Sequence, residues 1–131
     1  MVLVDTSVWI DYFNGIASRQ TDRLNALLGT GTVLVGDLIL TELLQGFARD
    51  TQFRRARLLM DEFPCADLAG RVVALQAAEN YRILRARGVT VRKTIDVIIA
   101  TFCILNEHVL LHANKDFTPM RRHIGLQVLD E

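Results

Sequence analysis

The fold class is decided by the first thirteen residues, Met1-Val2-Leu3-Val4-Asp5-Thr6-Ser7-Val8-Trp9-Ile10-Asp11-Tyr12-Phe13. The short apolar run at 2–4 predicts a buried strand of a parallel sheet. The next three residues favour caps and turns, and an apolar stripe at helical spacing follows them. A carboxylate is therefore expected where a strand ends and a helix begins. In open α/β sheets, ligands bind at that edge.

The same alternation of strands and helices continues along the chain. Apolar runs predict further strands at 32–35, 65–68, 108–112 and 126–129. Apolar residues at helical spacing predict helices at 20–28, 38–47, 51–63, 68–87 and 94–105, and one helical turn at 119–123. Strands that alternate with helices require right-handed crossovers, so we expect an α/β fold with a central, mainly parallel sheet covered on both faces. No linker or internal repeat is visible, so we expect one domain over 1–131.

Composition narrows the class of protein. Half of the 131 residues are hydrophobic and 23% are charged, which is typical of a globular chain. No apolar run approaches the roughly 18–20 residues that cross a bilayer, and no signal peptide is recognisable, so we expect a cytoplasmic protein. Fifteen basic residues balance fifteen acidic ones, which argues against bulk adhesion to nucleic acid but permits a local basic patch. Cys65 and Cys103 are expected to be reduced and buried.

Four acidic residues stand in positions that bring them to one edge of such a sheet. Asp5 follows the first strand, where it serves either as a helix N-cap or as part of a metal pocket. Glu42 lies in an apolar helix, and taken alone it is expected on the solvent side. Asp96 is in the first turn of an apolar helix, where the helix dipole is a sufficient reason for an acid. Asp116 follows the strand at 108–112, where a loop acid is unremarkable.

Taken together, these acids indicate a divalent metal site. Clustered carboxylates raise one another's pKa values unless a cation lies between them. Mg²⁺ and Mn²⁺ prefer such oxygen ligands, and one or two of these ions suffice to activate water and to stabilise the charge of phosphodiester hydrolysis. A zinc site is excluded because His108 and His112 are about 13 Å apart on an extended strand.

Four segments, in order and over essentially the full length, resemble the PIN domains of VapC-type toxins. They are Val2-Leu3-Val4-Asp5-Thr6-Ser7-Val8-Trp9, Thr41-Glu42-Leu43-Leu44-Gln45-Gly46, Asp96-Val97-Ile98-Ile99-Ala100 and Leu111-His112-Ala113-Asn114-Lys115-Asp116-Phe117. The resemblance implies a PIN-like α/β/α fold and a Mg²⁺- or Mn²⁺-dependent endoribonuclease that acts as the toxin of a type II toxin–antitoxin module. It also implies a VapB-type antitoxin as partner, a homodimer, and tRNA or ribosomal RNA as substrate.

The resemblance also assigns roles by position. The catalytic and metal-binding acids it implies are Asp5, Glu42, Asp96 and Asp116. Thr6 and Ser7 match the hydroxyl-bearing position that supports the first acid. The chain departs from the pattern at Asn114, where such toxins often have an acid. An amide still offers an oxygen but carries no charge, so the number of ions, one or two, stays open.

Three basic residues stand close to these acids in the sequence, and they are Arg92, Lys93 and Lys115. We expect them to grip phosphates beside the scissile bond. The cluster Arg54-Arg55-Arg57 is better explained as a solvated helix face. Two other functions remain open on the sequence: a non-catalytic PIN-like module that binds RNA or protein, and a phosphohydrolase of small molecules with the same acids.

Overall fold

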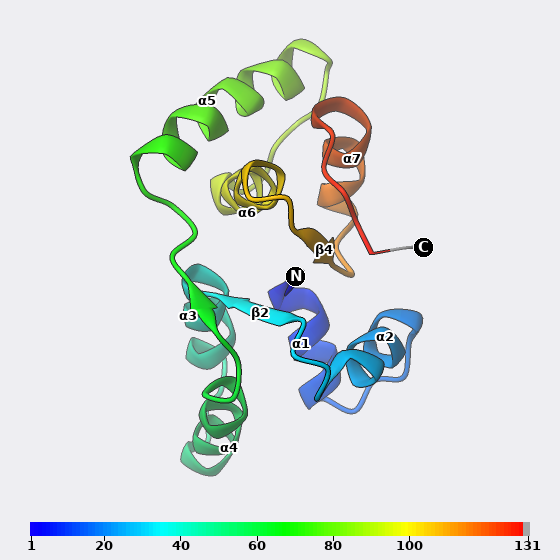
Figure 1. Ribbon diagram of the computed structural model, residues 1–131, viewed down its shortest axis with the longest axis vertical. Coiled ribbons are helices and arrows are strands. Elements are labelled where there is room, and N and C mark those ends of the chain that lie inside the picture. The colour runs from blue at the N-terminus through cyan, green and yellow to red at the C-terminus, as the bar shows by residue number, and fades with distance from the viewer. Residues whose placement is uncertain (130–131) are drawn as a thin grey trace.

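The computed structural model describes residues 1–129 and shows a parallel four-stranded sheet with helices on both faces (Figure 1). The strand order is β3-β2-β1-β4. The strands are β1 (Val2–Val4), β2 (Val33–Gly36), β3 (Cys65–Ala66) and β4 (Val109–Leu111). The helices are α1 (Thr6–Phe13), α2 (Arg19–Leu27), α3 (Asp37–Gln45), α4 (Asp50–Met60), α5 (Arg71–Ala86), α6 (Thr94–Leu105) and α7 (Thr118–Ile124), with a 3₁₀ turn η1 (Lys115–Phe117).

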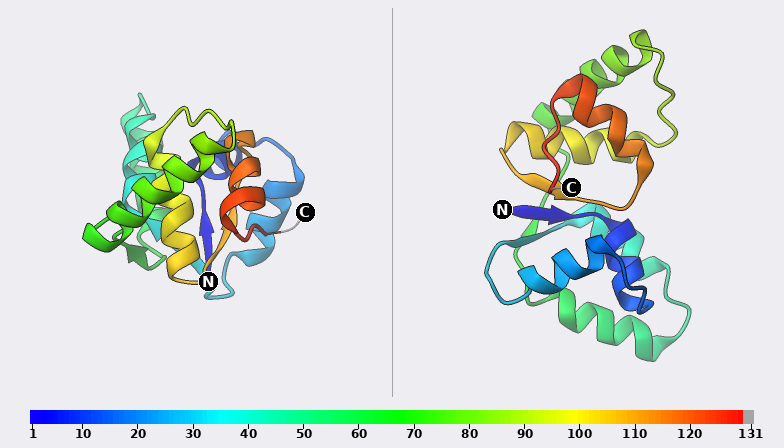
Figure 2. Two further views of the ribbon diagram at one scale, coloured as in Figure 1. Left: turned by 90° about the horizontal axis from the view of Figure 1, so that it is seen from above. Right: turned by 90° about the vertical axis from the view of Figure 1, so that its right-hand side faces the viewer.

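The sheet separates two layers of helices. Helices α1 to α4 lie on one side of it, and α5, α6 and α7 lie on the other (Figures 1 and 2). Because both faces are covered, every residue of β1 and β2 is buried, which explains why these strands are apolar throughout rather than alternating. The expected three-layer α/β/α architecture is confirmed.

The central strand β1 joins the two ends of the chain. Val4 is paired with Leu111 of β4, and Leu3 is paired with both Leu34 of β2 and Leu110 of β4. All these pairs are parallel, so the carboxyl ends of β1, β2 and β4 meet at one edge. Asp5 follows β1 and Asp116 follows β4 at that edge, whereas Glu42 lies within α3 and Asp96 lies in the first turn of α6.

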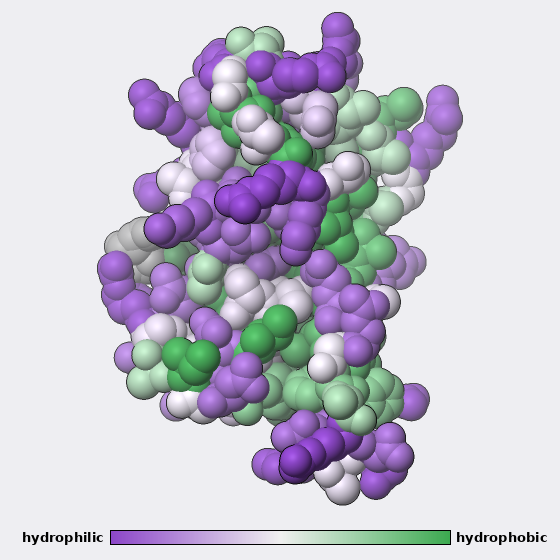
Figure 3. Space-filling model, turned by 180° about the vertical axis from the view of Figure 1, so that it is seen from behind, coloured by the Kyte–Doolittle hydropathy of each residue, from purple (hydrophilic) through white to green (hydrophobic). Residues whose placement is uncertain are grey.

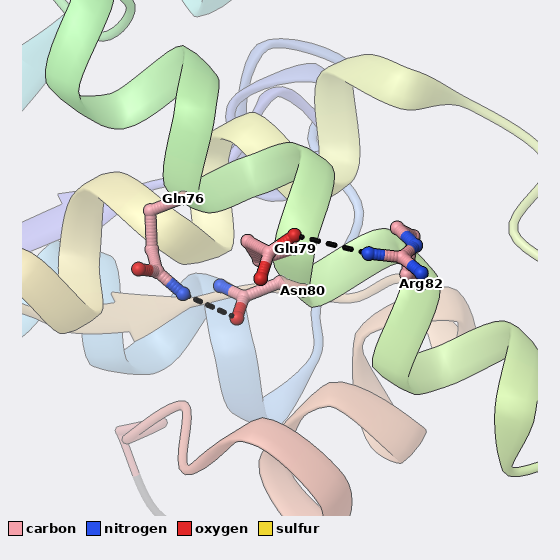
Figure 4. A network of polar contacts seen from close by, with 4 residues as sticks. All are labelled: Gln76, Glu79, Asn80 and Arg82. Carbon is pink, nitrogen blue, oxygen red and sulfur yellow. Dashed lines mark hydrogen bonds and ion pairs between the residues drawn. The ribbon is translucent and has the colours of Figure 1, made fainter.

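Helices α5 and α6 are joined by a buried polar contact. The Asn80 amide donates to the hydroxyl of Thr101 over 2.9 Å, and both side chains are buried. Gln76 donates to the oxygen of the same amide over 3.1 Å, one turn earlier on α5 (Figure 4). Buried polar groups without partners are costly, so this chain of hydrogen bonds favours one register of α6 against α5. Helix α6 carries Asp96, and its register positions that acid.

Two expectations about local structure were wrong. Helix α5 begins at Arg71 rather than at residue 68, because Leu68 is fully buried against Gly36 and Gly70 turns the chain with a φ of 88°. The segment 126–129 forms only an isolated parallel bridge between Leu110 and Val128 instead of a strand.

The two cysteines differ in burial. Cys103 is buried in α6, and burial, followed by the charge of Asp5, raises the pKa of its thiol to about 12. Cys65 is exposed, contrary to expectation, because the short strand β3 lies at the edge of the sheet. Both thiols are free. No helix among the described residues is long and apolar enough to cross a membrane.

Candidate active site

Asp5 is held at the point where β1 ends and α1 begins. It is the N-cap of α1 and is only 4% exposed. Its Oδ2 accepts hydrogen bonds from the backbone N–H of Ser7 over 3.0 Å and from the Ser7 hydroxyl over 2.6 Å. The Ser7 Oγ in turn accepts from the backbone N–H of Ala113, over 3.0 Å. The N-cap and the pocket interpretations of Asp5 are therefore compatible, and one serine ties the ends of β1 and β4 together.

Glu42 reaches the same edge from α3. Its Oε1 accepts a 2.8 Å hydrogen bond from the hydroxyl of Thr6, and the side chain is half-buried. The expectation of a solvent-facing Glu42, drawn from its helix alone, is corrected by this contact. The two hydroxyls that follow Asp5 thus bind different acids: the Ser7 hydroxyl donates to Asp5, and the Thr6 hydroxyl donates to Glu42.

Asp96 is the most unusual acid of the set. It lies in the first turn of α6 and is 5% exposed, as dry as its apolar neighbours predicted. Its Oδ2 is buried and has no hydrogen-bond partner among the described residues. Burial raises the pKa of Asp96 to about 6, with further upward contributions from the charges of Asp5, Asp116 and Glu42 and a downward one from Lys93. All four predicted acids therefore share one electrostatic environment.

Asp116 and Asn114 lie in the loop that follows β4. The Asn114 side chain is the N-cap of η1, and its Oδ1 accepts from the backbone N–H of Asp116 over 3.0 Å. The backbone N–H of Asn114 donates to His112 Nδ1 over 3.2 Å. An aspartate in place of Asn114 is able to make the same cap, so the amide retains the local fold while it removes one charge from the edge.

The basic residues are arranged around these acids. Arg92 forms an ion pair with Asp116, with 3.3 Å between Nη2 and Oδ1. Lys93 precedes α6 and acts on the Asp96 charge, and Lys115 is exposed beside Asp116. The role of these three residues in gripping phosphate stays a prediction. To bind phosphate, the Arg92 guanidinium has to leave the Asp116 carboxylate and pair with the phosphate instead.

The edge of the sheet at which Asp5, Glu42, Asp96 and Asp116 lie, called the acid edge from here on, faces one side of the molecule. In the right-hand view of Figure 2, β1 runs away from the N-terminus toward the side that Figure 3 shows. On that face, hydrophilic side chains cross the upper middle, and hydrophobic side chains gather in the lower half, where α1, α3 and α4 lie. Within residues 1–129, no three carboxylate, imidazole or thiol groups converge closely enough to coordinate one ion together.

An apolar groove lies beside the edge, between α1, α3 and α4. Its volume is about 390 Å³. Its apolar lining is made by Ile10, Phe13, Leu43 and Phe47, and Arg55 also lines it. Ile10 is 43% exposed, so the groove presents apolar surface to solvent. Sequence reasoning missed this groove, because its residues come from three helices and each fits a helix stripe by itself.

Comparison with known proteins assigns the chain to a family. Residues 2–122 match the PIN domain, which is most of the chain. This chain belongs to the PIN domain family. Its relatives include "Ribonuclease VapC11" of Mycobacterium tuberculosis and "VapC ribonuclease Mb1587" of Mycobacterium bovis, each 29% identical over 129 residues, with 97% of this chain and 96% of the relative covered.

Solved structures agree on the fold of this PIN domain. VapBC2 of Rickettsia felis, solved bound to a DNA fragment from their promoter, matches with a TM-score of 0.76 and 16% identity over 98% of this chain and 97% of the other. VapBC-1 of Haemophilus influenzae matches with a TM-score of 0.75 and 20% identity over 99% and 98%. VapC20 of Mycobacterium tuberculosis, a toxin that cleaves the sarcin–ricin loop, gives 0.69 and 16% over 92% and 95%.

Proposed function

We propose that this chain is a metal-dependent endoribonuclease and the toxin of a type II toxin–antitoxin module. The observation that carries the proposal is Asp96, a dry carboxylate with an unpartnered Oδ2 that shares its surroundings with three other acids. Such a cluster is unfavourable by itself and becomes favourable when a cation neutralises it. The ribonuclease names of the relatives that match 97% of the chain support the same function.

The residues present fit a hard divalent ion such as Mg²⁺ or Mn²⁺. The donors are carboxylates, which these ions prefer, and Mg²⁺ is commonly held by one or two carboxylates with water and substrate phosphate completing the shell. A site in which no three groups converge is compatible with that mode. We assign the ion to Asp5 and Asp96, with Glu42 and Asp116 acting through water. When bound, the ion supplies positive charge that polarises the phosphate and activates water.

The other side chains position these acids. Ser7 fixes the orientation of Asp5 through two hydrogen bonds to one oxygen, which leaves the other oxygen for a ligand. Thr6 does the same for Glu42 with one bond. Arg92, already beside Asp116, and Lys93 and Lys115 bring positive charge for the RNA backbone. The reaction they serve is hydrolysis of a phosphodiester bond in tRNA or ribosomal RNA.

The apolar groove between α1, α3 and α4 is the proposed seat of a VapB-type antitoxin. VapBC proteins of matching fold were solved as complexes of toxin and antitoxin, and a protein partner needs an apolar surface that this chain leaves open. Leu43 lines the groove and directly follows Glu42 in α3, so a partner chain seated in the groove lies near one of the four acids. Ile10→Asp is expected to abolish the complex and to leave metal binding intact, as measured by co-purification with the antitoxin and by a metal titration.

A homodimer is proposed for the opposite layer. Helix α5 exposes Val72 at 74% and Leu75 at 55%, and an apolar groove of about 510 Å³ lies between α5 and α6. Exposed apolar surface of this kind marks association sites. Light scattering of the chain and of a Val72→Asp, Leu75→Asp variant tests this: loss of the dimer in the variant is expected, and a dimer in both contradicts it.

The decisive experiment is cleavage of structured RNA by the purified chain with Mn²⁺. We expect cleavage that EDTA abolishes, that Asp96→Asn abolishes, and that Asp61→Asn, at an exposed acid on the end of α4, leaves unchanged. Equal cleavage by Asp96→Asn and the unchanged chain contradicts the assignment. If nothing is cleaved and Mn²⁺ stabilises neither protein, the chain is a binding module without catalysis.

A further inference from the structure

A small basic pocket lies beyond β4, apart from the acid cluster. It is formed where the N-terminus of α2, the end of β4 and helix α7 come together, with a volume of about 170 Å³. In Figure 1, α7 lies above β4 and α2 lies below it, one from each helix layer. Pockets for drug-sized ligands or cofactors occupy roughly 300–1,000 Å³. This pocket is smaller, and it suits a single small group.

Among the described residues that line the pocket, the charged side chains are arginines. Arg19 and Arg23 come from α2 and Arg121 comes from α7, and the polar groups of Gln20, His112 and Thr118 lie among them. No aspartate or glutamate is among the described residues that line it. Guanidinium groups recognise phosphate oxygens through paired N–H donors, and hydroxyl and amide groups complete such contacts. Arg19 and Arg121, which come from different helices, make this hollow a candidate anion site.

The pocket shares its wall with the acid edge. Leu111 and His112 line it, and the carbonyl oxygen of Leu111 accepts a 2.9 Å hydrogen bond from the backbone N–H of Asp5. His112 Nδ1 accepts from the backbone N–H of Asn114, and its ring packs 5.1 Å from that of Phe117. Leu111 therefore contacts both the pocket and the backbone of Asp5, which places the pocket next to the Asp5 end of the acid cluster. Arg92 and Lys93 instead lie in the segment before α6.

We propose that this pocket binds a backbone phosphate of the RNA, a few nucleotides from the scissile bond on the β4 side. The proposal rests on the proposed ribonuclease function, since it names a subsite of that substrate. The pocket fixes the register of the strand across the acids while Asp5 and Asp96 hold the ion. It reads charge and not base identity, as phosphate contacts do.

The test separates binding from cleavage. A double variant of the pocket, Arg19→Gln with Arg121→Gln (the pocket variant), is compared with a matched double variant on the exposed face of α4, Arg54→Gln with Arg57→Gln (the α4 variant). Affinity for a fluorescent single-stranded RNA is measured by anisotropy over a salt series, with Asp96→Asn in every protein so that nothing is cleaved. We expect a Kd roughly tenfold higher in the pocket variant, and a salt slope smaller by about 0.7 for each phosphate that the variant no longer binds. The α4 variant is expected to change neither.

A set of RNAs, each with one neutral methylphosphonate, then locates the contact. One position is expected to weaken binding to the protein with an intact pocket and to have no further effect in the pocket variant. Unchanged Kd and salt slope in the pocket variant, or an equal loss in the α4 variant, overturns the proposal. Cleavage assays with Asp96 restored keep the two claims apart. If the pocket variant binds RNA more weakly but the native chain cleaves no RNA, the nuclease function is contradicted and the phosphate-binding pocket is supported. If the native chain and the pocket variant both cleave RNA with the same KM, the nuclease function is supported and the pocket proposal is contradicted.

Discussion

Replacing Asp96 by asparagine is expected to stabilise the metal-free protein, although it destroys the proposed site. Burial and the neighbouring carboxylates raise the pKa of Asp96 from 3.8 to about 6. The native state therefore binds a proton that the unfolded state has released in this pH window. Stability falls as the pH rises from about 4 to about 6, and the full cost is present above that. At 1.36 kcal/mol per pKa unit, the cost of the ionised form is about 3 kcal/mol.

The assay is urea unfolding in EDTA at several pH values. The difference in unfolding free energy between Asp96→Asn and the native chain is expected to rise by about 3 kcal/mol in favour of the variant between about pH 4 and about pH 8. Asp61→Asn, at an exposed position, is expected to show no comparable gain. Saturating Mn²⁺ is expected to reverse the order, because binding to the native state stabilises only the protein that keeps the site. A difference that does not vary with pH refutes the reasoning.

Three further substitutions test the supports of the site, each by urea unfolding. Ser7→Ala removes the hydroxyl that donates to Asp5 and accepts from the backbone N–H of Ala113, and it is expected to cost about 1–3 kcal/mol and to weaken Mn²⁺ binding. Unchanged metal affinity contradicts the positioning role of this hydroxyl. Gly36→Ala places a Cβ 2.5 Å from the buried Leu68 side chain and is expected to lower the free energy of unfolding by about 1–3 kcal/mol. An unchanged free energy of unfolding means that the Leu68 side chain moves aside at little cost. Asn80→Ala leaves a buried hydroxyl of α6 without its donor, for an expected cost of about 1–3 kcal/mol.

Much of the fold was predictable because its signals are local. The strand at 2–4 and the helix at 94–105 match the structure residue for residue, since apolar runs bounded by capping residues leave few alternatives. The failures are tertiary. Leu68 reads as the start of a helix, and its side chain instead fills the space that Gly36 leaves open. Val128 pairs with β4 at one residue only, which no pattern of apolar residues reports.

The candidate site also has features that the sequence predicts and features that depend on tertiary packing. The acids at strand ends and helix starts were predictable, because parallel topology brings those positions to one edge. The partner of each acid was not. That Thr6 donates to Glu42 rather than to Asp5, and that Arg92 pairs with Asp116, depends on how α3 and the segment before α6 pack against the sheet. The pocket arginines were missed for the same reason, since they come from two helices far apart in the chain.

The pairing of β1 with β4 has a consequence for biosynthesis. Val2 lies beside Val109, so β1 and β4 cannot pair until residue 109 has left the ribosome. The acids span Asp5 to Asp116, and the serine that orients Asp5 reaches its partner only at Ala113. A nascent chain, or a fragment released by premature termination before that point, holds Asp5 without the rest of the cluster. The order of synthesis thus delays assembly of the proposed nuclease until the segment from Val109 to Asp116 has been translated.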